Sequence, residues 1–408
     1  MDTSIDLSGM TPKHAEHYQR SLKSIPWATQ TNAKRYDGEL VPSRPPFLKR
    51  AKGCRVWDLD DKEYIDFKAS LGPIILGYQY PLIEDAIKNQ LSNGVLFSMA
   101  SPIEIEAAEA ILNTLGWAEK IRFMKTGADV CACCLRLARS KTKRNKFATS
   151  GYHGYQDWFA LTWPNNGVPD VLNDFSHSLP YGDIAAIEAL FDEHGSELAA
   201  VIVSPFEWDQ APSQKFLKTL RAKCSEYGSV LIFDEILTGF RLAKGGAREF
   251  FDVEPDLAAY AKAIANGYPL SAYAGKAEFM DTLDKTIITT TYAGETLSLA
   301  ASQAVMQVLN NEPVIDHIHV LGQTMRDAFD DIFREFNYPA HTVGLSPAVT
   351  IQFEGDESEQ SAKRVELFNI LYEKGIFANK EWFITYSHTA SDIAKTVDEM
   401  HQAVKQIS

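Results

Sequence analysis

The chain has 408 residues, of which 45% are hydrophobic and 23% are charged, a composition typical of globular proteins. Its formal net charge of -14 argues against nucleic acid or an anionic membrane as its main partner, although a few local Arg or Lys residues are enough to hold an anionic substrate. The length exceeds what one hydrophobic core usually supports, so we expect a large domain and a smaller one.

No basic stretch followed by an apolar run opens the sequence, and no apolar segment is long enough to span a bilayer. We therefore expect a cytoplasmic protein without a signal peptide.

The N-terminal part, residues 1–66, is expected to belong to the smaller domain. Residues 1–50 are polar and contain Pro42, Pro45 and Pro46, which predicts an extended arm. The following segment WDLDDKEYIDF, residues 57–67, predicts a hairpin that turns at residues 60–62.

The middle of the chain, residues 67–312, is expected to form the large domain. Apolar runs at residues 199–203 and 230–233 predict buried strands. Amphipathic stretches precede them, one over residues 184–190 and one that ends at Gly228. This alternation predicts an α/β fold with a mostly parallel central sheet.

The C-terminal part, residues 313–408, is expected to complete the smaller α+β domain. Two long helical patterns flank a predicted strand at residues 348–353. The last helix is expected to begin near Ser391 as its N-cap, with an apolar stripe formed by Ile393, Val397, Met400 and Val404.

Three of the five cysteines, Cys131, Cys133 and Cys134, lie close together in a predicted helix over residues 129–140. Cys131 and Cys134 form a C-x-x-C pair, but a zinc or redox site would want a second pair of ligands, and the sequence offers none. We interpret these thiols as core residues and expect no metal site.

Ligands of such sheets bind at the carboxyl ends of the strands, where Asp234 follows a buried run. A carboxylate there can bind a metal, act as a base, or pair with a cationic ring nitrogen. A nucleotide hydrolase would also need a phosphate loop ending in Gly-Lys-Ser or Gly-Lys-Thr, which the sequence lacks.

Lys262 also follows an apolar run and precedes Gly267. Most lysines are solvated surface charges, but desolvation lowers the pKa of a lysine at the end of a buried strand and makes its amine nucleophilic. Such an amine forms a Schiff base with an aldehyde readily, and the nearby Asp234 strengthens this interpretation.

Two further segments could contact a ligand. Residues 125–129, KTGAD, place a glycine turn before a helix, whose N-terminus suits a phosphate but is also compatible with a plain N-capped helix. Residues 151–154, GYHG, offer an aromatic ring and a histidine, although such a loop is more often packed into a core.

Together and in this order, these segments resemble the class III (subgroup II) aminotransferases of fold type I, and among them enzymes of the glutamate-1-semialdehyde aminomutase type. The resemblance runs from about Trp57 to the final helix. The blocks that carry it are IDFKASLGPIILGYQYP, IRFMKTGADVCACCLRLAR, GYHGYQDW, LIFDEILTGFR, PDLAAYAKAIANGYP and TYAGETLSLAA.

The resemblance implies pyridoxal 5'-phosphate as the cofactor and a role for each matched residue. Lys262 would form the Schiff base and move the proton, and Asp234 would pair with the pyridine nitrogen. Thr126, Gly127 and Ala128 would contact the phosphate. Tyr152 would stack on one face of the ring and Ile236 on the other, with His153 near the edge. Thr291 would reach the phosphate of the neighbouring subunit, which implies a homodimer with sites at the interface.

Three residues depart from the family pattern. Ala128 replaces a threonine of the phosphate turn, Ser204 replaces a glutamate that precedes a proline, and Tyr78 replaces a histidine. The cofactor site therefore matches better than the substrate site. The segments GETLSLAA and IPWATQTNAKR resemble a branch found with surface-glycan genes, which implies a sugar or sugar acid as the carbonyl substrate.

We therefore expect an aminotransferase that moves an amino group from a donor such as glutamate to a carbonyl acceptor. The alternative is a 2,1-aminomutase acting on a semialdehyde, and a racemase on the same scaffold is a third option. A pyridoxal-binding regulatory protein would lack the lysine or add a DNA-binding domain. A dinucleotide oxidoreductase would need a Gly-x-Gly-x-x-Gly turn, which the sequence lacks.

Overall fold

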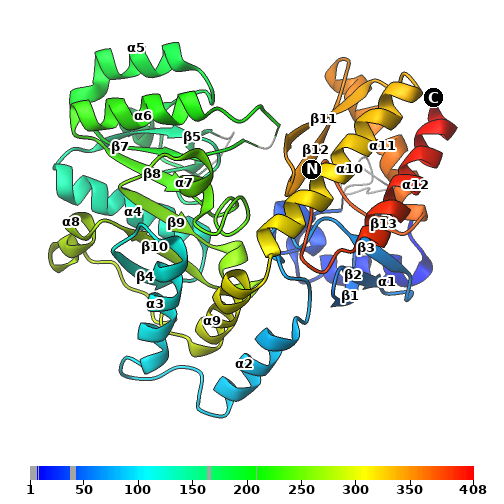
Figure 1. Cartoon of the computed structure of the whole chain (residues 1–408), viewed down its shortest axis with the longest axis horizontal. Coiled ribbons are helices and arrows are strands. Elements are labelled where there is room, and N and C mark those ends of the chain that lie inside the picture. The colour runs from blue at the N-terminus through cyan, green and yellow to red at the C-terminus, as the bar shows by residue number, and fades with distance from the viewer. Residues whose placement is uncertain (1–6, 8, 37–42, 163–166, 208) are drawn as a thin grey trace. The chain divides into compact units, whose positions relative to one another are not determined.

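The computed structural model describes the chain except for residues 1–6, 8, 37–42, 163–166 and 208. The chain divides into two compact units (Figure 1). Unit 1 comprises Met1–Leu71, Leu76–Tyr80 and Asp316–Ser408, and unit 2 comprises Gly72–Ile75 and Pro81–Ile315. Unit 1 is therefore built from both ends of the chain.

The core of unit 2 is a seven-stranded sheet in the order β4-β10-β9-β8-β7-β5-β6. The strands β5 to β9 run parallel to their neighbours, and only β10 pairs antiparallel, with β4 and with β9. The predicted α/β fold with a mostly parallel sheet is therefore confirmed. The strands are β4 (Lys120–Met124), β5 (Lys146–Ser150), β6 (Ser176–Ser178), β7 (Leu198–Val203), β8 (Val230–Asp234), β9 (Leu257–Tyr260) and β10 (Ser271–Gly275).

Helices flank this sheet in unit 2, and the apolar sequence of its central strands explains why they are needed. All six residues of β7 are buried, as a parallel strand covered on both faces requires. Helix α4 lies against the sheet and buries its three cysteines in the core. The helices are α2 (Pro81–Leu91), α3 (Pro102–Leu115), α4 (Gly127–Thr142), α5 (Ile184–His194), α6 (Gln214–Tyr227), α7 (Gly246–Phe251), α8 (Ala277–Met280) and α9 (Thr296–Asn311).

Unit 1 contains two small sheets, ordered β1-β2-β3-β13 and β11-β12-β14. The buried Trp382 packs against the rings of Phe67 and Phe329, whose centroids lie 5.2 and 5.1 Å away. The elements are α1 (Pro12–Leu22), β1 (Leu48–Lys52), β2 (Arg55–Asp58), β3 (Glu63–Asp66), α10 (Val314–Glu335), β11 (Ala340–Leu345), β12 (Ala348–Phe353), α11 (Glu357–Glu373), β13 (Ile376–Phe377), β14 (Glu381–Phe383) and α12 (Ala390–Ile407), with α10 beginning in unit 2.

Short 3-10 turns connect several of these elements. They are η1 (Pro26–Ala28), η2 (Asn32–Lys34), η3 (Ala160–Thr162), η4 (Asp170–Phe175), η5 (Gly195–Glu197), η6 (Lys262–Ala265) and η7 (Asp281–Lys285).

The extended arm predicted for residues 1–50 is wrong where the structure describes it. Helix α1 occupies Pro12–Leu22, with Thr11 as the N-cap and Pro12 at its first position, where proline is tolerated. The helix buries only His14 and Tyr18. Its apolar face is therefore small, and the sequence lacks the apolar periodicity that would have predicted a helix. Pro42 lies outside the described residues.

The prediction for the C-terminal part was also incomplete. Helix α11 and strands β11, β13 and β14 were missed. Strands β13 and β14 have only two and three residues, and α11 buries only four of its seventeen residues. The N-cap of α12 is Thr389, with a capping box to Asp392, so the predicted cap at Ser391 is wrong.

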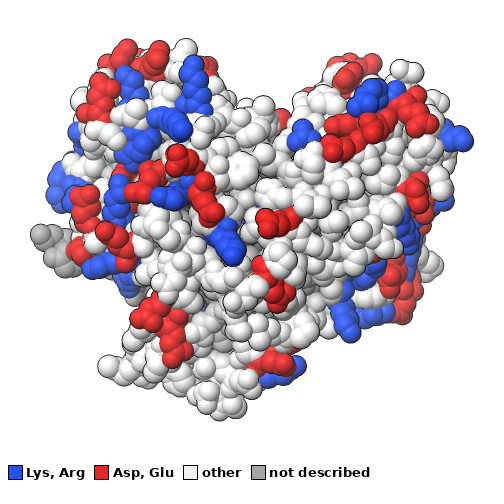
Figure 2. All heavy atoms as spheres, in the orientation of Figure 1, with Lys and Arg blue, Asp and Glu red and all other residues white. Residues whose placement is uncertain are grey.

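Among the described residues, no helix combines the length and apolar character needed to cross a membrane. On the face shown in Figure 2, acidic and basic side chains are intermixed over the described surface, and no broad basic area is visible there.

Candidate active site

A cavity of about 570 Å³ lies in unit 2 at the carboxyl ends of β5, β7, β8 and β9. Parallel strands bring their carboxyl ends to one edge of the sheet, so residues distant in sequence meet there. Eight of the nine residues predicted for the site line this cavity, and they are Thr126, Gly127, Ala128, Tyr152, His153, Asp234, Ile236 and Lys262.

Lys262 lines the cavity two residues after the end of strand β9. It has a φ of 48°, a left-handed conformation that is uncommon outside glycine, and it begins the turn η6. Burial lowers the pKa of Lys262 below its ordinary value; the nearby Asp234 carboxylate opposes this effect and the Arg241 guanidinium adds to it. A larger share of this amine is therefore uncharged, and nucleophilic, than in a surface lysine.

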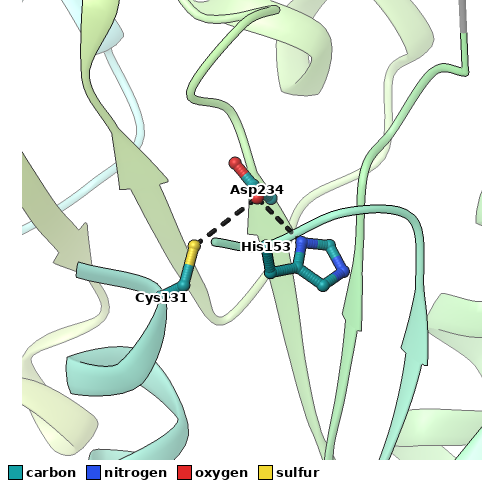
Figure 3. A group of neighbouring side chains, drawn as sticks. All are labelled: Cys131, His153 and Asp234. Carbon is teal, nitrogen blue, oxygen red and sulfur yellow. Dashed lines mark hydrogen bonds and ion pairs between the residues drawn. The ribbon is translucent and has the colours of Figure 1, made fainter. Parts of the chain in front are cut away.

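Asp234 is the last residue of β8, and its carboxylate is held by three hydrogen-bond donors. Oδ2 lies 2.8 Å from Nδ1 of His153 and accepts from Sγ of Cys131 at 3.5 Å (Figure 3). Oδ1 accepts from the backbone N–H of Ile236 at 3.0 Å. The carboxylate is buried, so these donors replace the water that it would otherwise bind.

The cavity ends on one side at the N-terminus of helix α4. Thr126 is the N-cap, and its hydroxyl accepts from the N–H of Asp129 in a capping box. The first N–H groups of a helix lack acceptors within the helix and favour an anion. A Cβ atom at Gly127 would lie 2.6 Å from Cδ1 of Ile236, so a glycine keeps this end open.

The loop that carries Tyr152 and His153 is held by a second close approach. Gly154 has a φ of 108°, and a Cβ atom there would lie 2.5 Å from Cβ of Ala128. Tyr152 is 60% exposed and lines the cavity, as a residue available for stacking must be.

Glu207 also lines the cavity but was missed from the sequence. Its carboxyl group lies beside Gly151 and Ser204, and Oε1 has no hydrogen-bonding partner among the described residues. Burial raises the pKa of Glu207 above its ordinary value. The only signal in the sequence is its place in the loop that follows β7.

Cys131 was assigned to the core, and the structure corrects this interpretation in part. The thiol is buried, as predicted, but it also contacts the carboxylate of Asp234. Periodicity alone does not tell which of three neighbouring thiols faces the site.

Two other residues singled out in the sequence do not line the cavity. Thr291 is exposed on unit 2. Tyr78 lies in unit 1, where its hydroxyl donates to Oδ2 of Asp66 at 2.8 Å.

The residues of the cavity fit a phosphorylated pyridine aldehyde. A desolvated amine can bond to an aldehyde, a buried carboxylate suits a protonated ring nitrogen, and a helix N-terminus suits a phosphate.

Comparison with known proteins gives consistent matches over nearly the whole chain. The family model of class-III aminotransferases matches residues 40–404. A glutamate-1-semialdehyde 2,1-aminomutase of Sulfurihydrogenibium sp. is 30% identical, covering 97% of this chain and 99% of that protein. A 3-aminobutyryl-CoA aminotransferase of Cloacimonas acidaminovorans is 31% identical, with 90% and 91% covered. Among solved structures, the FumI protein of Sphingopyxis sp. MTA144 in its PLP internal aldimine form is 25% identical, with 97% of each chain covered and a TM-score of 0.91.

Proposed function

This chain belongs to the class-III aminotransferases, which depend on pyridoxal 5'-phosphate, and we propose that it transfers an amino group from an amino donor to a separate carbonyl acceptor. The observation that carries the proposal is the placement of the desolvated Lys262 and the Asp234 carboxylate in one cavity.

Each residue of the cavity has a part in this reaction. When bound, pyridoxal phosphate supplies an electron sink for the carbon beside the amino nitrogen. Asp234 would hold the ring nitrogen protonated, and the N–H groups of Gly127 and Ala128 would bind the phosphate. Tyr152 and Ile236 would flank the ring. Lys262 would bond to the cofactor and, once released, move the proton between carbons.

We propose a hydroxylated acceptor, such as a sugar or sugar acid, and glutamate as a donor. Glu207 supports the acceptor class, because its carboxyl group lines the cavity beside the Ser204 hydroxyl. Its Oε1 atom makes no hydrogen bond within the described part of the chain and suits a hydroxyl donor of the substrate. Ser204, in place of the usual glutamate, adds a second small polar group beside it.

The second candidate is a 2,1-aminomutase, which isomerises a semialdehyde within one active site. The similarity to the aminomutase of Sulfurihydrogenibium favours it, and the equally similar aminotransferase of Cloacimonas favours transfer between two substrates. Identity near 30% over the whole chain therefore leaves the choice to the substrate-binding residues.

The two candidates differ when the holoenzyme receives an amino donor alone. A transaminase should release about one equivalent of carbonyl product per site and then stop, since the amino group stays on the cofactor until an acceptor arrives. The measurement is product release together with the loss of the absorbance band of the aldehyde cofactor. Lys262→Ala is the control and should release product more slowly by about a hundred- to ten-thousandfold.

An aminomutase would give another result. Supplied with glutamate-1-semialdehyde alone, it would turn over continuously, and efficient turnover of this kind would establish the second candidate in place of the first. The roles of Lys262 and Asp234 would be unchanged.

We also propose a cytoplasmic homodimer in which Thr291 of each subunit contacts the phosphate of the other. The exposure of Thr291, and its absence from the lining of the cavity in its own chain, support this arrangement.

A further inference from the structure

Cys131 lies in the first turns of α4, and its side chain is wholly buried. Figure 3 shows it on the opposite side of Asp234 from His153, with both side chains directed at the carboxylate. Sγ of Cys131 and Nδ1 of His153 share Oδ2, while Oδ1 accepts from the N–H of Ile236. The three donors come from a helix, a loop and the segment after β8, so they restrain the carboxylate from three directions.

The thiol is a donor in this contact. Burial, and then the charge of Asp234, raise the pKa of Cys131 well above its ordinary value. The proton therefore stays on sulfur at neutral pH, and an S–H group faces the carboxylate. A thiolate would instead repel it.

A metal site is the alternative reading of the same three residues, whose ligand atoms lie within 4.8 Å of one another. The spacing favours the hydrogen bonds. Tetrahedral bonds of about 2.1 Å would set the nitrogen and oxygen ligands of a zinc ion about 3.4 Å apart. Nδ1 of His153 lies only 2.8 Å from Oδ2 of Asp234, which is an ordinary hydrogen-bond length.

A role as core filler is the other alternative, and the neighbouring thiols provide the comparison. Cys133 and Cys134 are buried in the same helix, and no hydrogen bond joins either of them to Asp234 in the part of the chain that the structure describes. Cys131 alone of the three combines burial with a polar contact to the site.

We propose that Cys131 is a positioning residue, whose S–H group donates to Asp234 and fixes its carboxylate for the ring nitrogen of the cofactor. The proposal rests on the cofactor role proposed for Asp234. The thiol acts through that carboxylate and takes no part in the reaction itself.

The first test measures the affinity of the apoenzyme for pyridoxal phosphate. Cys131→Val keeps a small apolar side chain and removes the donor, so the dissociation constant should rise about five- to tenfold, as for one hydrogen bond to a charged acceptor. Cys131→Ser restores a donor and should bind nearly as the wild type does. Cys134→Val makes the same change on the same buried helix and should leave the affinity nearly unchanged.

The second test measures the S–H stretching band by infrared difference spectroscopy between the wild type and each cysteine variant. The band of Cys131 should lie at lower frequency than that of Cys134, because hydrogen bonding weakens the S–H bond. In Asp234→Asn, which offers a poorer acceptor, the Cys131 band should move toward the position of Cys134. This readout needs neither cofactor nor activity.

Several results would overturn the proposal. Equal losses of affinity in Cys131→Val and Cys134→Val would show a packing effect, and an unshifted Cys131 band would show that the hydrogen bond is missing. A metal site at Cys131, His153 and Asp234 would instead be established if the wild-type apoenzyme bound one zinc ion per chain and Cys131→Val, but not Cys134→Val, abolished this binding. If Asp234→Asn binds the cofactor normally, the proposed cofactor role of Asp234 is wrong. Cys131 would then have no positioning role, even if the band shift shows its hydrogen bond to Asp234.

Discussion

At the scale of single residues, the site depends on ionisable side chains for which burial outweighs the effect of the neighbouring groups. Lys262 loses part of its charge for this reason, and Glu207 keeps a proton to higher pH than an exposed glutamate does. The lowered pKa of Lys262 was predicted from its place after a buried run. The raised pKa of Glu207 was not, because it depends on how the folded loop excludes solvent. The strand ends that carry such residues can be read, and Asp234 and Lys262 were found in that way.

Glu207 gives a prediction about pH and substrate choice. Since its pKa is raised, the charged form is lost as the pH falls, beginning at a higher pH than for an exposed glutamate. The kcat/KM for a hydroxylated acceptor should therefore fall on acidification. Glu207→Gln should flatten this dependence, and Glu207→Leu should reduce the preference for hydroxylated over apolar acceptors about tenfold or more.

The control for this prediction is Asp209→Asn, which removes an exposed carboxylate from the same loop outside the lining of the cavity. The Asp209 carboxylate contributes to the raised pKa of Glu207, so the acid limb should persist in this variant but move toward lower pH. A Glu207→Leu enzyme with unaltered acceptor preference would show that this side chain does not contact the substrate.

At the scale of elements, the N-terminus of α4 and the loop of residues 151–154 meet where Gly154 lies against Ala128. The strands and helices of unit 2 were predicted well because β7 and β8 are continuous apolar runs and because Gly228 ends α6. The contact between Gly154 and Ala128 could not be predicted, since it joins two segments whose approach is set by the tertiary structure. The same holds for Cys131. The sequence does not distinguish it from Cys133 and Cys134, because its contact with Asp234 of β8 is set by the tertiary structure.

Gly154→Ala should destabilise the protein by about 2–4 kcal/mol. An alanine there would be strained by the positive φ, and its Cβ atom would clash with Ala128 of α4. Gly182→Ala is the matched control. Gly182 has a φ of 81° with no atom near its added Cβ, so the loss there should be about 1 kcal/mol. Denaturant unfolding curves of both variants measure the difference, and equal losses would contradict the clash.

At the scale of the whole molecule, the proposed dimer gives a prediction by complementation. Neither Lys262→Ala nor Thr291→Ala should be fully active alone. If Thr291 acts across the interface, each hybrid dimer contains one site with both lesions and one with neither, so mixing the two variants should restore part of the activity. Activity assays before and after subunit exchange measure this.

Subunit exchange must be shown separately, with differently tagged chains. Exchange without any recovery of activity would place Thr291 within its own site or outside both. The sequence could indicate Thr291 only by resemblance, because a residue that serves a second subunit leaves no periodic or local pattern in its own chain.

The pairing of β3 with β13 joins Ile65 to Ile376, near opposite ends of the chain. During translation, β3 is synthesised long before β13. The edge of β3 that pairs with β13 therefore stays unpaired while all of unit 2 is synthesised. Exposed strand edges promote association with other chains. Premature termination before β13 would leave that edge permanently bare, and such fragments should depend on chaperones or aggregate even where unit 2 has folded.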